Sequence, residues 1–190
     1  MRNFQLIRAG IDVSGIKSSL LSDGYASIWL KDTNRQRLSS ALKDTLNIHM
    51  RRLPFVAENV NESNRILTIV DDTNIMQLDT MKIIRTICDS VFESEIARSY
   101  GRIMISRLKA GCSVGRHTDR GDYFDHYRGR YHLVIAANEG CGAEIDGETS
   151  IMREGEIWWV NNHVPHTFWN NGETDRINVI FDLGLQTPCT

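Results

Sequence analysis

The sequence predicts a mainly β fold in which helices from the N-terminal part pack on one sheet. From Gly101 onward, apolar runs of five to seven residues are separated by Gly, Asn and Asp, the pattern of an all-β sandwich or barrel. Asp146-Gly147 lies between two of these runs and predicts a two-residue hairpin, because Gly tolerates the positive φ of such a turn. Upstream, apolar residues recur at helical spacing. Together these features predict a double-stranded β-helix, the jelly roll of cupin-like proteins.

The C-terminal part is expected to contain eight short strands. They are predicted at 102–108, 114–119, 130–137, 142–145, 148–152, 156–160, 165–170 and 176–182. Eight strands joined by short turns suit two packed antiparallel sheets. The segment 120–129 is too polar for a strand and is expected to be a loop.

The first hundred residues mix helical and strand patterns. Asp12-Val13-Ser14 is expected to cap a helix that runs to about Leu21, and a strand is expected over 26–30. Apolar spacing predicts a helix over 33–46, a strand over 66–70 and a longer helix over 78–100. The sequence has no repeat and no Pro/Gly/Ser-rich linker. We therefore expect one domain over 1–190, with an α/β part at 1–100 and the double-stranded β-helix core at 101–185.

Composition narrows the classes of function. With 22 Lys and Arg against 24 Asp and Glu, the net charge is −2, which argues against nucleic acid or an anionic membrane as the partner. No apolar run approaches the roughly 20 residues that span a bilayer, and the N-terminus lacks a secretory pattern. The four cysteines show no CxxC spacing, so we expect reduced thiols and a cytoplasmic location.

Three residues could bind one metal ion. His117 and Asp119 are two residues apart, so on a strand both side chains lie on the same face. His166 begins another predicted strand, whereas His163 falls in the preceding turn. Two histidines and a carboxylate leave three positions of an octahedron open, as a non-haem Fe(II) oxygenase requires. An H-x-D pair alone is also common as a surface His near an Asp.

Arg176, at the start of the last predicted strand, is a candidate anion ligand. The apolar residues that alternate with it, Ile177, Val179 and Phe181, are expected on the opposite face. A buried guanidinium offers a planar two-point grip for a carboxylate. The alternative is a surface arginine paired with Glu173 or Asp175.

Arg130 and His132 share one face of an earlier predicted strand. Leu133 and Ile135 are expected on the other face. The two polar side chains could hydrogen-bond the same anion as Arg176, or they could belong to a polar face turned to water.

A series of motifs runs through the C-terminal part in a fixed order: Ile105-Ser106-Arg107-Leu108-Lys109-Ala110-Gly111, Gly115-Arg116-His117-Thr118-Asp119, Arg130-Tyr131-His132-Leu133, Arg153-Glu154-Gly155-Glu156, His166 with Asn170, and Arg176 to Asp182. In order and spacing this series resembles the aspartyl/asparaginyl β-hydroxylase family of Fe(II)/2-oxoglutarate-dependent oxygenases, which has the double-stranded β-helix fold. The resemblance covers roughly residues 102–183.

The resemblance implies a reaction and a set of site residues. By it, iron is bound by His117 and His166, and the cosubstrate 2-oxoglutarate is held by Ser106, Arg130, His132 and Arg176. The implied reaction uses O₂ to hydroxylate an unactivated C–H of an amino acid, peptide or protein side chain, with release of succinate and CO₂. The metal and cosubstrate carry this chemistry, and the protein positions them.

Asp119 departs from part of that family. The animal aspartyl hydroxylases have glycine at this position, whereas several small bacterial members keep an acid. The full metal-binding triad is therefore available in this chain. Residues 1–100 do not match the helical-repeat region of the animal enzymes, so their substrate in disulfide-rich extracellular domains is not carried over.

The loop predicted after the triad is where substrate contacts are expected. Arg120, Asp122 and Tyr123 are the candidates, because such loops often carry specificity, although an ordinary solvated loop is the alternative. Their charges indicate a polar substrate, and the short chain favours a small molecule or peptide. Two other functions stay open: a cupin-like metalloenzyme that uses the triad without 2-oxoglutarate, and a non-catalytic jelly-roll binding module.

Overall fold

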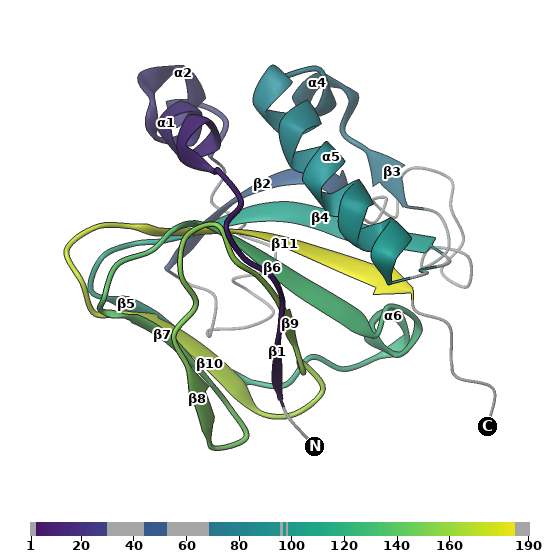
Figure 1. Cartoon of the computed structure of the whole chain (residues 1–190), viewed down its shortest axis with the longest axis vertical. Helices are drawn as coiled ribbons and strands as arrows, with labels where there is room; N and C mark the ends of the chain where they lie inside the picture. Colours follow the sequence, from purple (N-terminus) through teal and green to yellow (C-terminus); the bar gives the residue numbers. More distant parts are fainter. Residues whose placement is uncertain (1–2, 30–43, 53–68, 96, 98, 185–190) are drawn as a thin grey trace.

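The computed structural model describes residues 3–29, 44–52, 69–95, 97 and 99–184, which form two antiparallel sheets and several helices (Figure 1). The strands are β1 (Phe4–Arg8), β2 (Thr45–Arg52), β3 (Val70–Asp71), β4 (Ser99–Leu108), β5 (Cys112–His117), β6 (Gly129–Ala136), β7 (Cys141–Ile145), β8 (Glu148–Ser150), β9 (Ile157–Val160), β10 (His166–Asn170) and β11 (Arg176–Gly184). The helices are α1 (Ser14–Leu21), α2 (Asp23–Ala26), α4 (Thr73–Met76), α5 (Asp79–Ser94) and α6 (Asp122–His126). Among these helices none has the length and apolar character that crossing a bilayer would take.

The chain from β4 to β11 passes repeatedly from one sheet to the other. The larger sheet has the order β1-β9-β6-β11-β4-β2-β3, and the smaller one has the order β5-β10-β7-β8. This alternation is that of a jelly roll, as predicted. All eight strands expected between 102 and 182 are present, with ends shifted by at most three residues.

The hairpin predicted at Asp146-Gly147 joins β7 to β8. Both residues have positive φ, 48° and 83°, as a type I′ turn requires of its two central residues. Ile145 and Glu148 are paired directly beside the turn. Turn chemistry therefore sets the register of this strand pair.

The N-terminal part follows the predictions less closely. The helix expected to end near Leu21 is confirmed as α1. The strand expected over 26–30 is wrong for its described residues, which belong to α2, a turn and the residue that follows it. Here the Trp29 indole donates a hydrogen bond to the Leu20 carbonyl at 3.1 Å, which folds the segment back against α1.

The helix predicted over 78–100 is confirmed as α5 but ends early, at Ser94. The helix ends there because the chain turns back, so that Tyr100 already belongs to β4 and lies against the helix. The Tyr100 ring stacks on Phe92 with centroids 4.6 Å apart, and its hydroxyl donates to Asp89 at 2.7 Å. Local spacing cannot reveal such a tertiary contact.

Two other predictions fall mostly outside the described residues. Of the helix expected over 33–46, only the last residues are described, and Thr45 and Leu46 begin β2. Of the strand expected over 66–70, residues 69 and 70 are described, and residue 70 begins β3. β1 and β2 were not predicted. In β2 the apolar residues Leu46, Ile48 and Met50 alternate with polar ones, which is the pattern of a strand. The helix expected to reach residue 46 takes in the start of this run, so the strand was missed.

The apolar core has two parts, one on each face of the larger sheet. Helices α1 and α5 cover the outer face (Figure 1). Their buried side chains pack there against the predicted apolar faces of β6 and β11, including Leu133, Ile135, Ile177, Val179 and Phe181. A smaller cluster fills the space between the sheets, with Phe4, Val134, Ile145 and Phe168. The polar residues that alternate along β6 and β11 therefore face the smaller sheet.

The two adjacent tryptophans of β9 divide between these clusters. Trp158 packs with the residues between the sheets, and Trp159 packs with the helix-covered cluster. This is the alternation expected of neighbouring strand residues.

Gly155 lies against Ile11, where the N-terminal segment packs on the jelly roll. A substitution at Gly155 tests this contact. Its φ is +76°, and a Cβ there would lie 2.4 Å from the Ile11 carbonyl oxygen, while the Ile11 N–H donates to the Gly155 carbonyl at 3.1 Å. We expect Gly155→Ala to lower the free energy of unfolding by about 3 kcal/mol or more, through strain plus displaced backbone. Gly147→Ala, at φ +83° with nothing near its Cβ, should cost only about 1–2 kcal/mol. Urea unfolding compares the two, and equal losses would contradict the contact with Ile11.

Candidate metal centre

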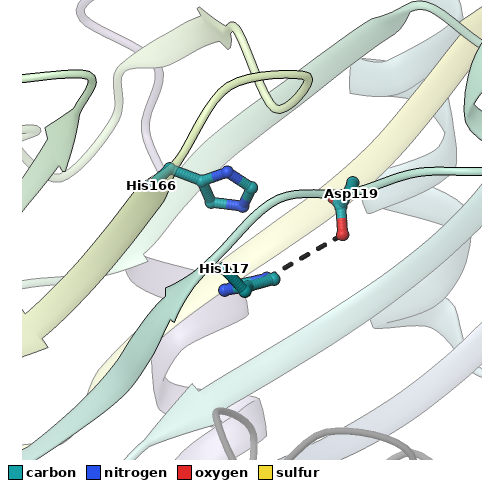
Figure 2. A group of neighbouring side chains, drawn as sticks. All are labelled: His117, Asp119 and His166. Carbon is teal, nitrogen blue, oxygen red and sulfur yellow. Dashed lines mark ion pairs between the residues drawn. The ribbon is translucent and has the colours of Figure 1, made fainter.

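The three predicted metal ligands lie together at one end of the space between the sheets. His117 ends β5, His166 begins β10, and the two residues are paired across these strands. Their ring centroids are 4.3 Å apart, and His117 Nε2 is 3.8 Å from Asp119 Oδ1. One ligand atom from each residue lies within 4.8 Å of the others. The three side chains point toward one another (Figure 2), so the group could hold a metal ion.

Both imidazoles are oriented by the backbone. Nδ1 of His117 faces the Gly115 carbonyl at 2.8 Å, and Nδ1 of His166 faces the Val164 carbonyl at 2.9 Å. A carbonyl oxygen only accepts, so each Nδ1 carries the proton and each Nε2 keeps its lone pair for a metal. Burial lowers the pKa of His166 to about 4, which keeps this ring neutral at physiological pH.

Asp119 is held so that one carboxylate oxygen stays available. Its Oδ2 accepts from Arg130 Nη1 and from Asn162 Nδ2, the latter at 3.0 Å. Burial raises the pKa of Asp119, but the Arg130 charge, followed by the Asn162 hydrogen bond, outweighs it and lowers the pKa to about 2. The ionised carboxylate therefore presents Oδ1 toward the histidines.

Arg176 is buried in the same pocket as the triad, only 2 % exposed. Its Nη1 donates to the Gly142 carbonyl at 3.4 Å, its Nη2 lies 3.7 Å from Met152 Sδ, and its Nε has no hydrogen-bond partner among the described residues. The guanidinium lies over the Phe168 ring. Burial lowers the pKa of Arg176 to about 10, so the group is still charged at neutral pH.

The alternative of a surface Arg176 paired with a neighbouring carboxylate is not what the structure shows. Asp175 accepts instead from Arg107 Nε at 2.7 Å, and Glu173 is exposed. Within the described part of the chain, no carboxylate forms an ion pair with Arg176. A buried, unpaired guanidinium is costly unless an anion joins it.

His132 and Ser106 line the same pocket as Arg176. His132 stacks on Phe168 with centroids 5.1 Å apart, and its buried Nδ1 has no hydrogen-bond partner in the part of the chain that the structure describes. Burial and the charges of Arg176 and Arg130 hold the pKa of His132 well below its usual range. The 2-oxoglutarate-binding roles that the resemblance gives these residues stay predictions.

Arg130 and His132 lie on the same face of β6, as predicted, but Arg130 already forms ion pairs with protein carboxylates. Besides Asp119, it contacts Asp182 through two hydrogen bonds, from Nε at 2.7 Å and from Nη2 at 3.0 Å. Its nitrogens are thus engaged by protein carboxylates. Binding of 2-oxoglutarate by Arg130 stays a prediction that this arrangement does not favour.

The segment predicted as a loop over the metal contains the short helix α6. Arg120 and Asp122 are exposed, as substrate contacts would need to be. Tyr123 is buried, and its hydroxyl donates to Asp182 at 2.8 Å and accepts from the Arg102 N–H at 2.8 Å. The expected substrate contact of Tyr123 is therefore corrected, because both of its hydrogen bonds are made inside the protein.

Three buried asparagines of the pocket were missed as site residues. Asn47, Asn162 and Asn178 line the pocket, and the side-chain oxygen of each has no hydrogen-bond partner in the described ranges. Asn162 lies between the predicted strands 156–160 and 165–170, so strand alternation does not indicate its direction, yet it contacts Asp119. Asn47 was missed because its strand, β2, was not predicted. Asn178 alternates with Arg176 on β11, which could have indicated its inward direction.

The fold and the site define a jelly-roll protein with a candidate centre of two histidines and one carboxylate. The family model for aspartyl/asparaginyl β-hydroxylases matches residues 56–184. The chain belongs to this family of 2-oxoglutarate-dependent hydroxylases. The match begins well upstream of residue 102, where the recognisable motifs start, so it includes α5 as well as the jelly roll.

Three solved structures show weak similarity to parts of this chain. A conserved protein of unknown function from Streptococcus pyogenes is 18% identical, with 47% of this chain and 69% of that chain covered and a TM-score of 0.36. A salicylate 1,2-dioxygenase from Pseudaminobacter salicylatoxidans is 21% identical, with 43% and 20% covered and a TM-score of 0.34. A predicted oxalate decarboxylase from Thermotoga maritima is 15% identical, with 51% and 74% covered and a TM-score of 0.37.

Proposed function

We propose that the protein is an Fe(II)- and 2-oxoglutarate-dependent dioxygenase that hydroxylates an unactivated C–H of an amino acid, peptide or protein side chain. Succinate and CO₂ are the other products. One observation carries the proposal: the guanidinium of Arg176, which is buried and forms no ion pair with a carboxylate of the described residues, lies in the same pocket as the three candidate metal ligands. A metal ion would be bound by the three ligands, and one carboxylate of a dicarboxylate bound to that ion would pair with the Arg176 charge.

The donor set fits Fe(II). His117 Nε2, His166 Nε2 and Asp119 Oδ1 would hold the ion, and three ligands of this kind leave room for a bidentate cosubstrate and O₂. When bound, Fe(II) and 2-oxoglutarate supply the oxidative chemistry, and the protein supplies position and a dry site. The backbone carbonyls behind the two imidazoles keep each ring in the tautomer that a metal needs.

The pocket also fits a dicarboxylate cosubstrate. Arg176 would pair with the carboxylate far from the metal, and Ser106 and His132 would assist. Phe168 lies between the two ends, because its ring contacts both His166 and Arg176. The pocket is also lined by the apolar residues Leu108, Val114 and Val160. They would exclude water and so strengthen an ion pair between Arg176 and the cosubstrate.

The primary substrate would approach past α6. Arg120 and Asp122 are exposed beside Asp119 in the sequence and remain our candidates for contacts with a polar substrate. A small molecule or short peptide is the substrate class that we propose. Nothing in the net charge of −2 favours nucleic acid.

An anaerobic titration tests the cofactor chemistry without knowledge of the substrate. We expect metal-free protein to develop the visible charge-transfer band of the Fe(II)–2-oxoglutarate chelate when both are added. Fe(II) bound without the band would contradict the use of 2-oxoglutarate and favour a cupin-like metalloenzyme of another kind. Folded protein that binds no Fe(II) would favour a non-catalytic binding module.

A further inference from the structure

Asp119 is oriented by side chains, whereas the two histidine ligands are oriented by backbone carbonyls. Arg130 and Asn162 both donate to Oδ2, and only Oδ1 faces His117 (Figure 2). A carboxylate can rotate and exchange its two oxygens as ligands. Two donors on one oxygen remove that freedom, so the orientation of Asp119 depends on where Arg130 is held.

Arg130 is held in place by Asp182, through nitrogens other than the one that contacts Asp119. The guanidinium and the carboxylate meet as a fork, with Nε donating to Oδ1 at 2.7 Å and Nη2 donating to Oδ2 at 3.0 Å. Arg130 is 6 % exposed and Asp182 is 1 % exposed. A buried, bidentate pair of this kind fixes direction as well as charge.

Asp182 is in turn fixed by α6 and β4. The Tyr123 hydroxyl donates to Asp182 Oδ2 at 2.8 Å and accepts from the Arg102 N–H at 2.8 Å. The Arg102 guanidinium lies 3.5 Å from the same carboxylate oxygen and over the Tyr123 ring. A continuous buried chain thus runs from the segment after the triad, through Asp182 and Arg130, to a metal ligand.

We propose that Arg130, Asp182 and Tyr123 are positioning residues for the carboxylate ligand Asp119. Arg130 therefore serves the metal site before any cosubstrate arrives, which differs from the role in 2-oxoglutarate binding that the family resemblance implies. This inference rests on the proposed function only in that the triad binds a divalent metal ion. The charges of Asp119 and Asp182 balance those of Arg130 and Arg102, so the buried cluster is neutral before the ion enters.

The test is a titration with Co(II) alone, without 2-oxoglutarate, followed by the visible absorption of the bound ion. We expect Asp182→Asn and Arg130→Gln each to weaken Co(II) binding by about tenfold to a hundredfold, the usual effect of losing the partner of a metal ligand. Tyr123→Phe, which removes one hydroxyl, should shift the affinity in the same direction by less. The Co(II) spectrum should also change in these variants, because the ligand oxygen is no longer fixed.

Arg107→Gln is the matched control. It breaks an arginine–aspartate pair on the same sheet, Arg107 with Asp175 at 2.7 Å, that does not contact the triad, and we expect wild-type Co(II) affinity. Circular dichroism checks that each variant folds, and if the Asp182 variant does not fold, Tyr123→Phe decides. Wild-type Co(II) affinity in folded Arg130→Gln or Tyr123→Phe would overturn the positioning role alone. Wild-type protein that binds no Co(II) would overturn the proposed function as well.

Discussion

His166→Ala is expected to abolish the binding of Fe(II) and the formation of succinate. His166 is 3 % exposed and supplies one of three ligand atoms that lie within 4.8 Å of one another. Its removal leaves two ligands, so the loss in affinity should exceed the tenfold to hundredfold typical of an outer partner. Anaerobic calorimetry with Fe(II) measures the affinity directly.

His163→Ala is the control for this prediction. His163 lies three residues earlier in the turn before β10, and it is not part of the group of candidate ligands. We expect this variant to bind Fe(II) like the wild type. Unchanged iron affinity after loss of His166, or an equal loss in the His163 variant, would show that the wrong histidine has been assigned.

Arg176→Met is expected to weaken the binding of 2-oxoglutarate and to raise the stability of the ligand-free protein. Loss of one partner of a buried charge pair costs about 2–5 kcal/mol, so the affinity for 2-oxoglutarate should fall by about thirtyfold or more. Without ligand, the free energy of unfolding should instead rise by about 1–2 kcal/mol, because the variant no longer buries an unpaired charge. The affinity for Fe(II) alone should not change.

Thermal unfolding with and without 2-oxoglutarate checks both effects of Arg176→Met. Fe(II) and 2-oxoglutarate together should raise the Tm of the wild type but leave the Tm of the variant at its value with Fe(II) alone. Arg107→Met is the control, and its free energy of unfolding should change in the opposite direction. Arg107 is paired with Asp175, so its loss should lower the free energy of unfolding by up to about 1 kcal/mol. A variant of Arg176 that keeps full affinity for 2-oxoglutarate would contradict the proposed function.

Much of the jelly roll could be predicted because its signals are local. Each strand from β4 to β11 alternates or is bounded by turn residues, and Asp146-Gly147 specifies its hairpin through backbone conformation alone. The spacing of His117 and Asp119 likewise placed two ligands on one face before any fold was known. The apolar partners of Arg176 and Arg130 indicated which faces turn inward.

The N-terminal part was harder to predict because its structure depends on distant contacts. The segment after α1 has strand-like residues, yet the contact of Trp29 with Leu20 turns it back. β2 is buried on both faces: Thr45 and Asn47 line the pocket, and Ile48 and Met50 lie in the apolar core. Its alternation of polar and apolar residues is that of a strand with one exposed face, so the sequence alone does not show that Thr45 and Asn47 are buried.

The sequence by itself determined the class of fold, the three candidate ligands and the position of Arg176, because periodicity and spacing are properties of the chain. Only the tertiary structure decided what each polar group contacts. It placed the Arg176 charge in the pocket without an ion pair to any described carboxylate, engaged Arg130 with Asp119 and Asp182, and buried Tyr123 beside them. Hydrogen bonds between residues far apart in sequence depend on how the two sheets pack, and no local pattern encodes that packing.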